Sequence, residues 1–305
     1  MDAIFQHLLT ADPAVTPSED LHAWWDRHRD LAMDRTFPVD HALAAGFAMD
    51  RVGWAFATGY QCALARLFPG LPPGRPAALA VTEAAGGHPR AIATLLAGPP
   101  GARTLSGHKR FITLGFYAEV LFVVATTGTD DAGRPRLVVA MMEAWAPGIT
   151  LTAGPETPFA PEVPHGAADF RGVSVPDNAV LPGDGYADYV KPFRTVEDAH
   201  VTAAVGAYLL RLAREHRWPR ESVADLVAVL AGVRAAALAD PRSPAVHIAL
   251  DGLLRALRVW IASAAVHLDA LPEPARSRWV RDQGLLVVAD RVRAARTEAA
   301  WTALE

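Results

Sequence analysis

The sequence predicts an α+β fold that is mostly α, with a small β-domain between two helical regions. Apolar residues recur every three or four positions from Leu21 to about Phe68, which is the period of amphipathic helices. From Ala77 the pattern changes to short β-branched runs separated by Gly, Pro and Asp, which is typical of strands. After Lys191 the helical period returns. We therefore expect an N-terminal helical region over 1–75, a central β-domain over 76–190 and a C-terminal helix bundle over 191–305.

The N-terminal region contains two helical patterns, LHAWWDRHRDLAMDR from Leu21 and an alanine-rich segment from His41 to Phe68. The proline cluster PGLPPGRP ends it, because proline lacks a backbone donor and has a fixed φ. Cys62 is the chain's single cysteine, so no internal disulfide and no multi-thiolate metal site can form, and we expect a buried structural thiol. None of the eleven histidines lies in a ligand-spaced motif such as HExxH, so we predict no metal site.

The central region is typical of a small barrel or sandwich. Its runs LAVTE, FITLG, VLFVVATT, RLVVAMME and ITLTA are followed by VPHGAADFRGVSVP. The C-terminal region has four long helical patterns joined by short proline-containing turns, which predicts an antiparallel four-helix bundle. These patterns run from about Thr195 to Arg217, Glu221 to Ala239, Ala245 to Leu268 and Ala275 to Leu304.

Composition and charge exclude several classes of function. The 305 residues are 51% hydrophobic and 20% charged, as in packed globular proteins. The net charge of -4 leaves no basic excess for phosphates, so we expect no nucleic-acid binding. No window offers about 18 uninterrupted apolar residues, and the acidic N-terminal segment does not fit a signal peptide. We therefore expect no membrane attachment and a cytoplasmic location.

Two segments of the β-region carry a resemblance to a known family. Thr82 to Pro89 reads TEAAGGHP, and Leu105 to Gly115, after a 15-residue gap, reads LSGHKRFITLG. These resemble the flavin-contacting segments TEPGAGSD and NGxKxWITNG of acyl-CoA dehydrogenases, in the same order and at almost the same separation. The segments APGITLT, ADFRGVSVPDNAVLPGDGY and WVRDQGLLVVADRVRAAR resemble the family's later strand, its hairpin and its closing helix with an RDA motif.

The resemblance implies a set of contacts to FAD. In the family, a threonine of the first segment bonds the flavin pyrimidine, and an aromatic residue and a threonine of the second cover and bond the isoalloxazine ring. By position these residues are Thr82, Phe111 and Thr113. A flat, poorly hydrated ring fits an aromatic face flanked by fixed donors and acceptors. Arg281, which opens the RDA-like motif, is implied as a further cofactor contact.

The resemblance also implies a catalytic base. The glutamate that many members carry nine residues after the RDA arginine is replaced here by Asp290. Other members take the base from the helix after the β-domain, where Glu197, Asp198 and His200 lie at the expected helix start. A carboxylate and an imidazole on adjacent turns can perform acid/base chemistry. The alternatives are a surface pair of Asp290 with Arg291 and an ion-paired helix start.

Three functions stay open from the sequence. The first is an FAD-dependent oxidoreductase, in which a base removes the α-proton of a small-molecule acyl thioester or a related substrate and a hydride passes to the flavin. The second is a flavin-free descendant of the fold that uses His88, Asp198 and His200 for acid/base chemistry, with His88 and His200 as candidate substrate contacts. The third is a non-catalytic subunit paired with a homologue. The apolar stripe in WVRDQGLLVVA predicts a homodimer or homotetramer.

Overall fold

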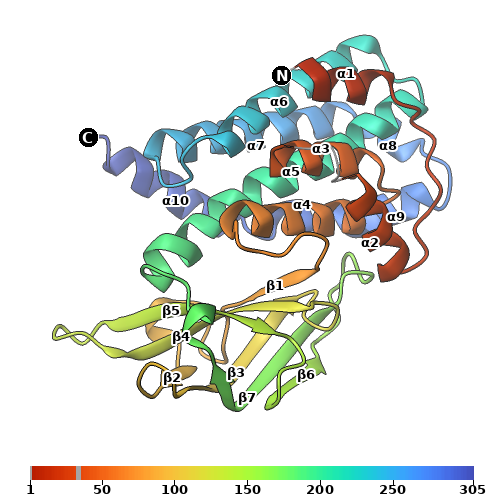
Figure 1. The fold of residues 1–305 in the computed structure, drawn as a ribbon. Helices are drawn as coiled ribbons and strands as arrows, with labels where there is room; N and C mark the ends of the chain where they lie inside the picture. Colours follow the sequence, from red (N-terminus) through yellow and green to blue (C-terminus); the bar gives the residue numbers. More distant parts are fainter. Residues whose placement is uncertain (1, 32–35) are drawn as a thin grey trace. The chain divides into compact units, whose positions relative to one another are not determined.

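The computed structural model describes residues 2–31 and 36–305 and divides them between two compact units. We call these the helical unit and the β unit. The helical unit consists of Met1–Arg66, Thr157–Glu162 and Thr195–Glu305, and the β unit consists of Leu67–Glu156 and Val163–Arg194. The elements of both are labelled in Figure 1. The short segment at 157–162 therefore lies between two strands in sequence but belongs to the helical unit.

Ten α-helices lie in the described residues, with a short 3-10 helix, η4, between the last two. They are α1 Asp2–Thr10, α2 Leu21–Asp30, α3 Pro38–Phe47, α4 Val52–Leu67, α5 Lys191–Glu215, α6 Arg220–Leu238, α7 Pro244–Ser263, α8 Ala265–Asp269, α9 Ala275–Asp282, η4 Gln283–Val287 and α10 Asp290–Thr302. The predicted helix from Leu21 extends in sequence into residues 32–35, which lie outside the described residues. Helix α1 was not predicted from the sequence.

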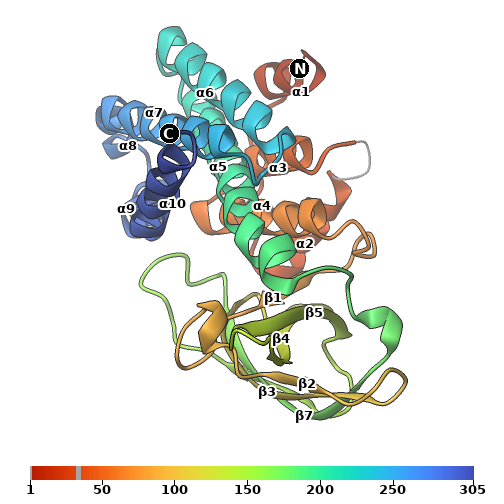
Figure 2. The ribbon, with the colours of Figure 1, turned by 90° about the vertical axis from the view of Figure 1, so that its left-hand side faces the viewer.

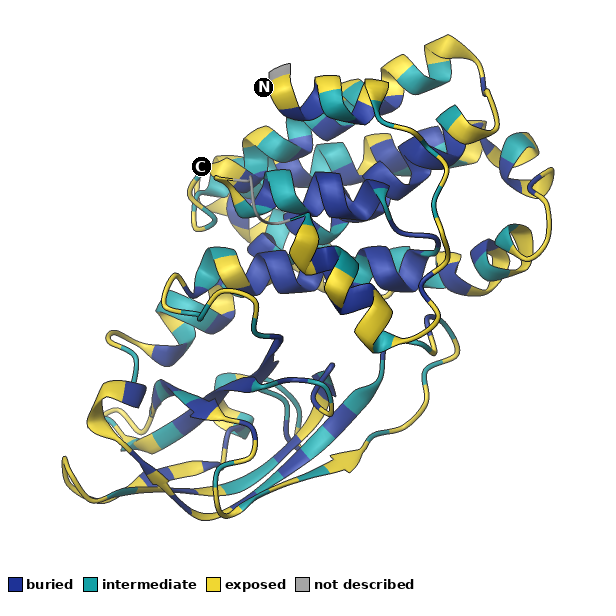
Figure 3. Cartoon of the chain, turned by 45° about the vertical axis from the view of Figure 1, so that its right-hand side comes forward, coloured by how far each residue is buried: buried dark blue, intermediate teal, exposed yellow. Residues whose placement is uncertain are grey.

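Helices α4 and α5 are buried on most sides. Figure 3 shows buried residues, in dark blue, concentrated in the middle of the helical unit. A helix that is apolar all round belongs in a core. The two helices pack closely because Gly59 has no side chain: a Cβ there would lie 2.5 Å from the Cα of Val201. Both helices are rich in alanine, whose small side chain also allows the helices to approach closely.

Two of the predicted C-terminal helices are divided in the structure. The expected helix from Ala275 to Leu304 consists of α9, η4 and α10, with Gly284 inside the 3-10 segment. Glycine lowers helix stability because it has the most backbone freedom to lose, which favours a break there. The expected helix from Ala245 to Leu268 consists of α7 and α8, and the chain resumes at Ala265 after a one-residue interruption.

The β unit is built on one mixed, seven-stranded sheet. Its strands are β1 Ala77–Ala80, β2 Leu95–Ala97, β3 Arg103–Thr113, β4 Val120–Thr129, β5 Pro135–Glu143, β6 Ile149–Ala153 and β7 His165–Val175. The hydrogen-bonded order is β1-β4-β2-β3-β7-β6, with β5 paired to β4. Strands β1 and β2 run parallel to β4, and the other pairs are antiparallel.

The sheet is strongly bent and encloses its own core. Figure 2 shows β1, β4 and β5 on one side and β3 and β7 on the other. Buried side chains from both sides meet between them, including Leu105, Leu121, Val123, Phe170 and Val173. Within the described ranges we find no helix whose length and apolarity would suffice for a bilayer crossing.

Candidate functional site

The two segments with flavin-type motifs lie side by side in the β unit. The backbone N–H of Arg110 in β3 donates to the carbonyl of Thr82 over 2.8 Å. After Thr82 the chain turns back tightly, with reciprocal backbone bonds of 3.1 and 2.9 Å between Glu83 and Gly86. Gly86 has φ +108°, which L side chains rarely adopt, so glycine fits the turn. The two segments, Thr82 to Pro89 and Leu105 to Gly115, thus form one continuous surface of the β unit, which we call the wall.

A buried ion pair holds this wall together. Lys109 is fully buried and donates to Glu83 Oε1 over 2.7 Å and to the carbonyl of Val81 over 3.0 Å. Glu83 also accepts from the N–H groups of Ala93 and Thr94. Burial lowers the pKa of Lys109 to about 8. Burial opposes ionisation of Glu83, yet the bonds from Lys109 and the two N–H groups lower its pKa. This pair was not predicted, although both residues lie inside the two flavin-type segments.

Phe111 stands exposed on this wall at an irregularity in β3. The register of β3 with β7 shifts between Lys109 and Ile112, and Phe111 between them has φ +53°. A non-glycine residue in this region carries a cost of about 1 kcal/mol. Its side chain is 56% exposed. An aromatic ring held outward by a strained backbone is typical of a binding surface, since neither feature helps folding.

Thr82 and Thr113 are both half-buried. Thr113 lies two residues after Phe111 in sequence, and Thr82 bonds the residue before Phe111, Arg110, across the wall. Thr113 pairs with His165 of β7 in the sheet register. Gly87 leaves the hydroxyl of Thr82 uncovered, because a side chain there would begin 3.4 Å from Thr82 Oγ1. The three residues implied to contact the flavin therefore share one region of the β unit.

His88 has a local structural role next to this region. It is exposed and precedes the short 3-10 helix Pro89–Ala91, where its Nδ1 accepts from the N–H of Arg90 over 3.2 Å. The imidazole therefore caps a turn. One ring nitrogen is occupied in this arrangement, and the other is the one available to a ligand.

Arg281 is engaged in ion pairs inside the helical unit. Its guanidinium donates to both carboxylate oxygens of Asp282 over 2.6 and 2.7 Å and to Glu162 over 3.2 Å. Asp282 is fully buried and also accepts the backbone N–H of Ala160 over 2.7 Å. Asp282 and Glu162 raise the pKa of Arg281. Arg281 thus fastens the segment at 157–162 to α9.

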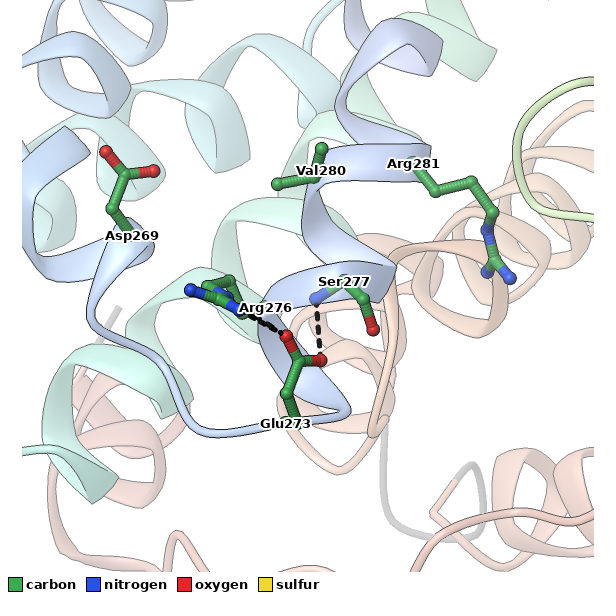
Figure 4. Close-up of a pocket in the computed structure, with 6 residues that line it drawn as sticks. All are labelled: Asp269, Glu273, Arg276, Ser277, Val280 and Arg281. Carbon is green, nitrogen blue, oxygen red and sulfur yellow. Dashed lines mark hydrogen bonds and ion pairs between the residues drawn. The ribbon is translucent and has the colours of Figure 1, made fainter.

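Arg281 also borders a shallow surface pocket at α8 and α9 (Figure 4). The pocket is lined by Asp269, Glu273, Arg276, Ser277, Val280 and Arg281. Glu273 accepts from the Arg276 guanidinium over 2.8 Å and from the backbone N–H of Ser277 over 3.3 Å. Figure 4 shows the side chain of Arg281 pointing away from this pair. Among these six described residues, Glu273, Arg276 and Arg281 are thus held in ion pairs, which leaves Asp269 as the lining charge that pairs with none of the others.

The two aspartates expected as bases meet in one ion-pair network of the helical unit. Both oxygens of Asp198 accept from guanidinium groups, from Arg293 over 2.9 Å and from Arg296 over 2.7 Å. Asp290 is bound by Arg258 and, over 3.2 Å, by Arg293. The partners of Asp290 are therefore Arg258 and Arg293 rather than its neighbour in sequence. Burial opposes the charge of Arg293, yet the two aspartates raise its pKa.

The other candidates on α5 differ in burial. Glu197 is half-buried. His200 is fully buried, and its Nδ1 bonds the carbonyl of Val196 over 2.7 Å. Burial lowers the pKa of His200 to about 4, so the ring is neutral near pH 7. With no solvent access, His200 cannot exchange protons with a substrate in this conformation.

The fold formed by these units is that of the acyl-CoA dehydrogenases. Butyryl-CoA dehydrogenase from Megasphaera elsdenii aligns with a TM-score of 0.69 and 15% identity, over 93% of this chain and 90% of that one. The prolyl acyl carrier protein oxidase AnaB aligns with a TM-score of 0.67 and 14% identity, over 91% and 89%. The FAD complex of PigA aligns with a TM-score of 0.66 and 14% identity, over 92% and 89%.

These likenesses are to folds, since the identities are low. No protein-family model and no curated protein sequence matches the chain. The predicted likeness to acyl-CoA dehydrogenases is confirmed at the level of the fold.

Proposed function

We propose that this protein is an FAD-dependent oxidoreductase of the acyl-CoA dehydrogenase type, acting on an acyl thioester or a related substrate. The observation that carries the proposal is Phe111, an exposed aromatic side chain on a strained bulge beside the Thr82 segment. The solved structures support it, since one contains FAD and two are named as a dehydrogenase of an acyl-CoA and an oxidase of a carrier-bound acyl group.

The residues of the β unit fit a flavin ring. Phe111 offers an apolar face for stacking, and the hydroxyls of Thr82 and Thr113 offer hydrogen bonds to the polar edge of the ring. The buried Glu83–Lys109 pair keeps this wall rigid, which limits the entropy lost on binding. When bound, FAD supplies the acceptor for a hydride from the substrate.

The carboxylates of the helical unit fit their expected role less well. A general base must reach the proton that it removes. Both oxygens of Asp198 are held by Arg293 and Arg296, and Asp290 is held by Arg258 and Arg293. Removal of an α-proton by either aspartate therefore requires an arginine partner to move. This network favours, as a second candidate, a descendant of the fold that does not dehydrogenate thioesters.

Titration of the purified full-length protein with FAD tests the proposal. We expect saturable binding, followed by quenching of flavin fluorescence. Phe111→Ala should lose affinity by tenfold or more, because it removes both the stacking of the ring, about 1 kcal/mol, and the apolar area that the ring buries. Phe116→Ala is the matched control, because Phe116 is also exposed, at 51%. Equal affinities in the two variants would place the ring elsewhere.

The substrate is tested on the FAD-loaded protein under anaerobic conditions. Bleaching of the flavin by butyryl-CoA or by an acyl carrier protein thioester is expected for a dehydrogenase. Stable yellow protein that no thioester bleaches supports the second candidate. Protein that takes up no FAD contradicts the flavin proposal as a whole.

A further inference from the structure

Three side chains that commonly bind transition metals meet inside the helical unit. His28 on α2, His41 on α3 and Cys62 on α4 each offer one ligand atom, and these atoms all lie within 4.8 Å of one another. His28 is 4% exposed and Cys62 is 1% exposed. In residues 2–31 and 36–305 this is the one group of three or more His, Cys, Asp or Glu ligand atoms so close together. Spacings of 13 and 21 residues match no short metal-binding motif, so this cluster could not be predicted from the sequence.

The imidazole of His41 is held as metal-binding histidines usually are. The Nε2 of His41 lies 2.7 Å from the carbonyl of His28, so this nitrogen carries the proton and the lone pair lies on Nδ1. A second ring nitrogen that donates to a backbone carbonyl is the common way of fixing a histidine ligand. The rings of His28 and His41 lie 4.2 Å apart. Trp25 stacks on His28 at 5.0 Å, which restricts rotation of its ring.

One ring nitrogen of His28, a residue of this cluster, lacks a hydrogen-bond partner in the described part of the chain. The Nδ1 of His28 is buried and has no hydrogen-bond partner among the described residues. A buried polar atom without a partner costs about 1–3 kcal/mol. Native proteins rarely keep such atoms unless water, an ion or a functional role accounts for them. Because His28 belongs to a set of ligating side chains, an ion is the explanation consistent with its neighbours.

We propose that His28, His41 and Cys62 bind a divalent transition metal ion of the zinc class. Thiolate and imidazole are the ligands that Zn²⁺ prefers, with bonds of about 2.3 and 2.0–2.1 Å in a tetrahedral site. Those bonds require ligand atoms about 3.3–3.6 Å apart, so side-chain shifts of about 1 Å would close the present cluster. Cys62 binds as the thiolate and releases its proton to solvent. Three protein ligands leave one coordination position.

Such a site would join three helices of the N-terminal region. It lies among side chains that have no part in the proposed flavin wall, so its expected role is structural. The proposal is independent of FAD binding, and either can fail while the other stands.

The test is a titration of chelator-treated, full-length protein with Co²⁺ and then Zn²⁺. We expect one Co²⁺ per chain, a thiolate-to-cobalt charge-transfer band, and displacement of Co²⁺ by Zn²⁺. Excess Zn²⁺ should raise the Tm by roughly 5 °C, as binding to the folded state alone does. Cys62→Ser should remove the charge-transfer band, and His41→Gln should weaken binding at least tenfold.

His216→Gln is the matched control, because His216 lies at the end of α5, away from the cluster in sequence, and should leave both readouts unchanged. A wild-type protein that binds neither ion and shows no change in Tm overturns the proposal without any variant. Binding that persists with the same band in Cys62→Ser also overturns it, since the thiolate would then have no role.

Discussion

The β unit and the helical unit use buried charge in different ways. In the β unit, the Glu83–Lys109 pair lies behind the wall and leaves Phe111 exposed in front of it. In the helical unit, the carboxylate of Asp198, expected as a base, is itself inside the ion-pair network with Arg293. The first arrangement supports an exposed surface that can bind a ligand. In the second, the carboxylate that was expected to act as a base is already bound by an arginine. One fold thus places a buried ion pair behind an exposed aromatic surface in one unit and uses a candidate base within an ion-pair network in the other.

Breaking the buried pair of the β unit should have the largest effect. Lys109→Met leaves Glu83 buried without its counter-charge, so we expect the free energy of unfolding to fall by about 3–5 kcal/mol. Lys191→Met is the control, because Lys191 is exposed. Scanning calorimetry measures both. A loss below about 1 kcal/mol, the usual value for exposed pairs, would show that the pair is not holding the wall.

The second prediction concerns how the buried His200 makes the stability of the protein depend on pH. Its folded pKa of about 4 lies below its ordinary value of 6.5, so the unfolded chain binds more protons between these values. Above about pH 6.5 the ring is neutral in both states and protonation of His200 does not affect the free energy of unfolding. As the pH falls from 6.5 toward 4, protonation of the unfolded chain lowers the free energy of unfolding, by about 3 kcal/mol in all. Urea unfolding at several pH values should show a shallower acid dependence in His200→Gln than in the wild type. His216→Gln should retain the wild-type slope.

Removing one arginine of the network should have a smaller effect. Arg293→Met deletes one charged bond to Asp198 and one to Asp290, while Arg296 still holds Asp198. We expect a loss of about 2 kcal/mol, the usual value for a hydrogen bond to a charged group. Arg255→Met removes an exposed guanidinium that pairs with Asp251, and should change stability by less than about 0.5 kcal/mol. Chemical unfolding of both variants gives the comparison, and equal losses would contradict it.

The smallest predicted effect distinguishes two contributions of Phe111, the strain of its backbone and the contact made by its ring. Phe111→Gly and Phe111→Ala both remove the ring, but only glycine relieves the positive φ at this position. We expect the glycine variant to be more stable than the alanine variant by about 1 kcal/mol. Both should lose FAD affinity equally if stacking is the role of the ring. Thermal unfolding and the FAD titration measure the two effects independently.

Much of the fold could be predicted because periodicity is a local signal. The change from a period of three or four to alternating β-branched runs located the β unit, and the later return located α5, α6 and α7. Strand β2 was missed because Leu95–Ala97 is too short to show a pattern. The division of the last helix was missed because alanine and arginine on both sides of Gly284 favour helix.

The candidate site was predictable where its residues lie in motifs. The order of the two flavin-type segments predicted that Thr82 and Phe111 would be neighbours. The partners of Asp198 were out of reach, since Arg293 and Arg296 are 95 and 98 residues away. The alternative to Asp290 as base was a surface pair with Arg291. Adjacent helical residues point in different directions, and the arginine three positions on, Arg293, faces Asp290 instead.

The path of the chain has a practical consequence for anyone who wants to dissect this protein. The boundaries of the units fall at four places in the sequence, so the helical unit is assembled from three separate stretches. A fragment that encodes 67–194 carries away the loop containing Ala160, whose N–H satisfies the buried carboxylate of Asp282. Cutting the chain at these boundaries would remove one hydrogen-bond donor from the buried Asp282, which among the described residues would keep only its bonds from Arg281. Recombination between homologues should therefore preserve both units together.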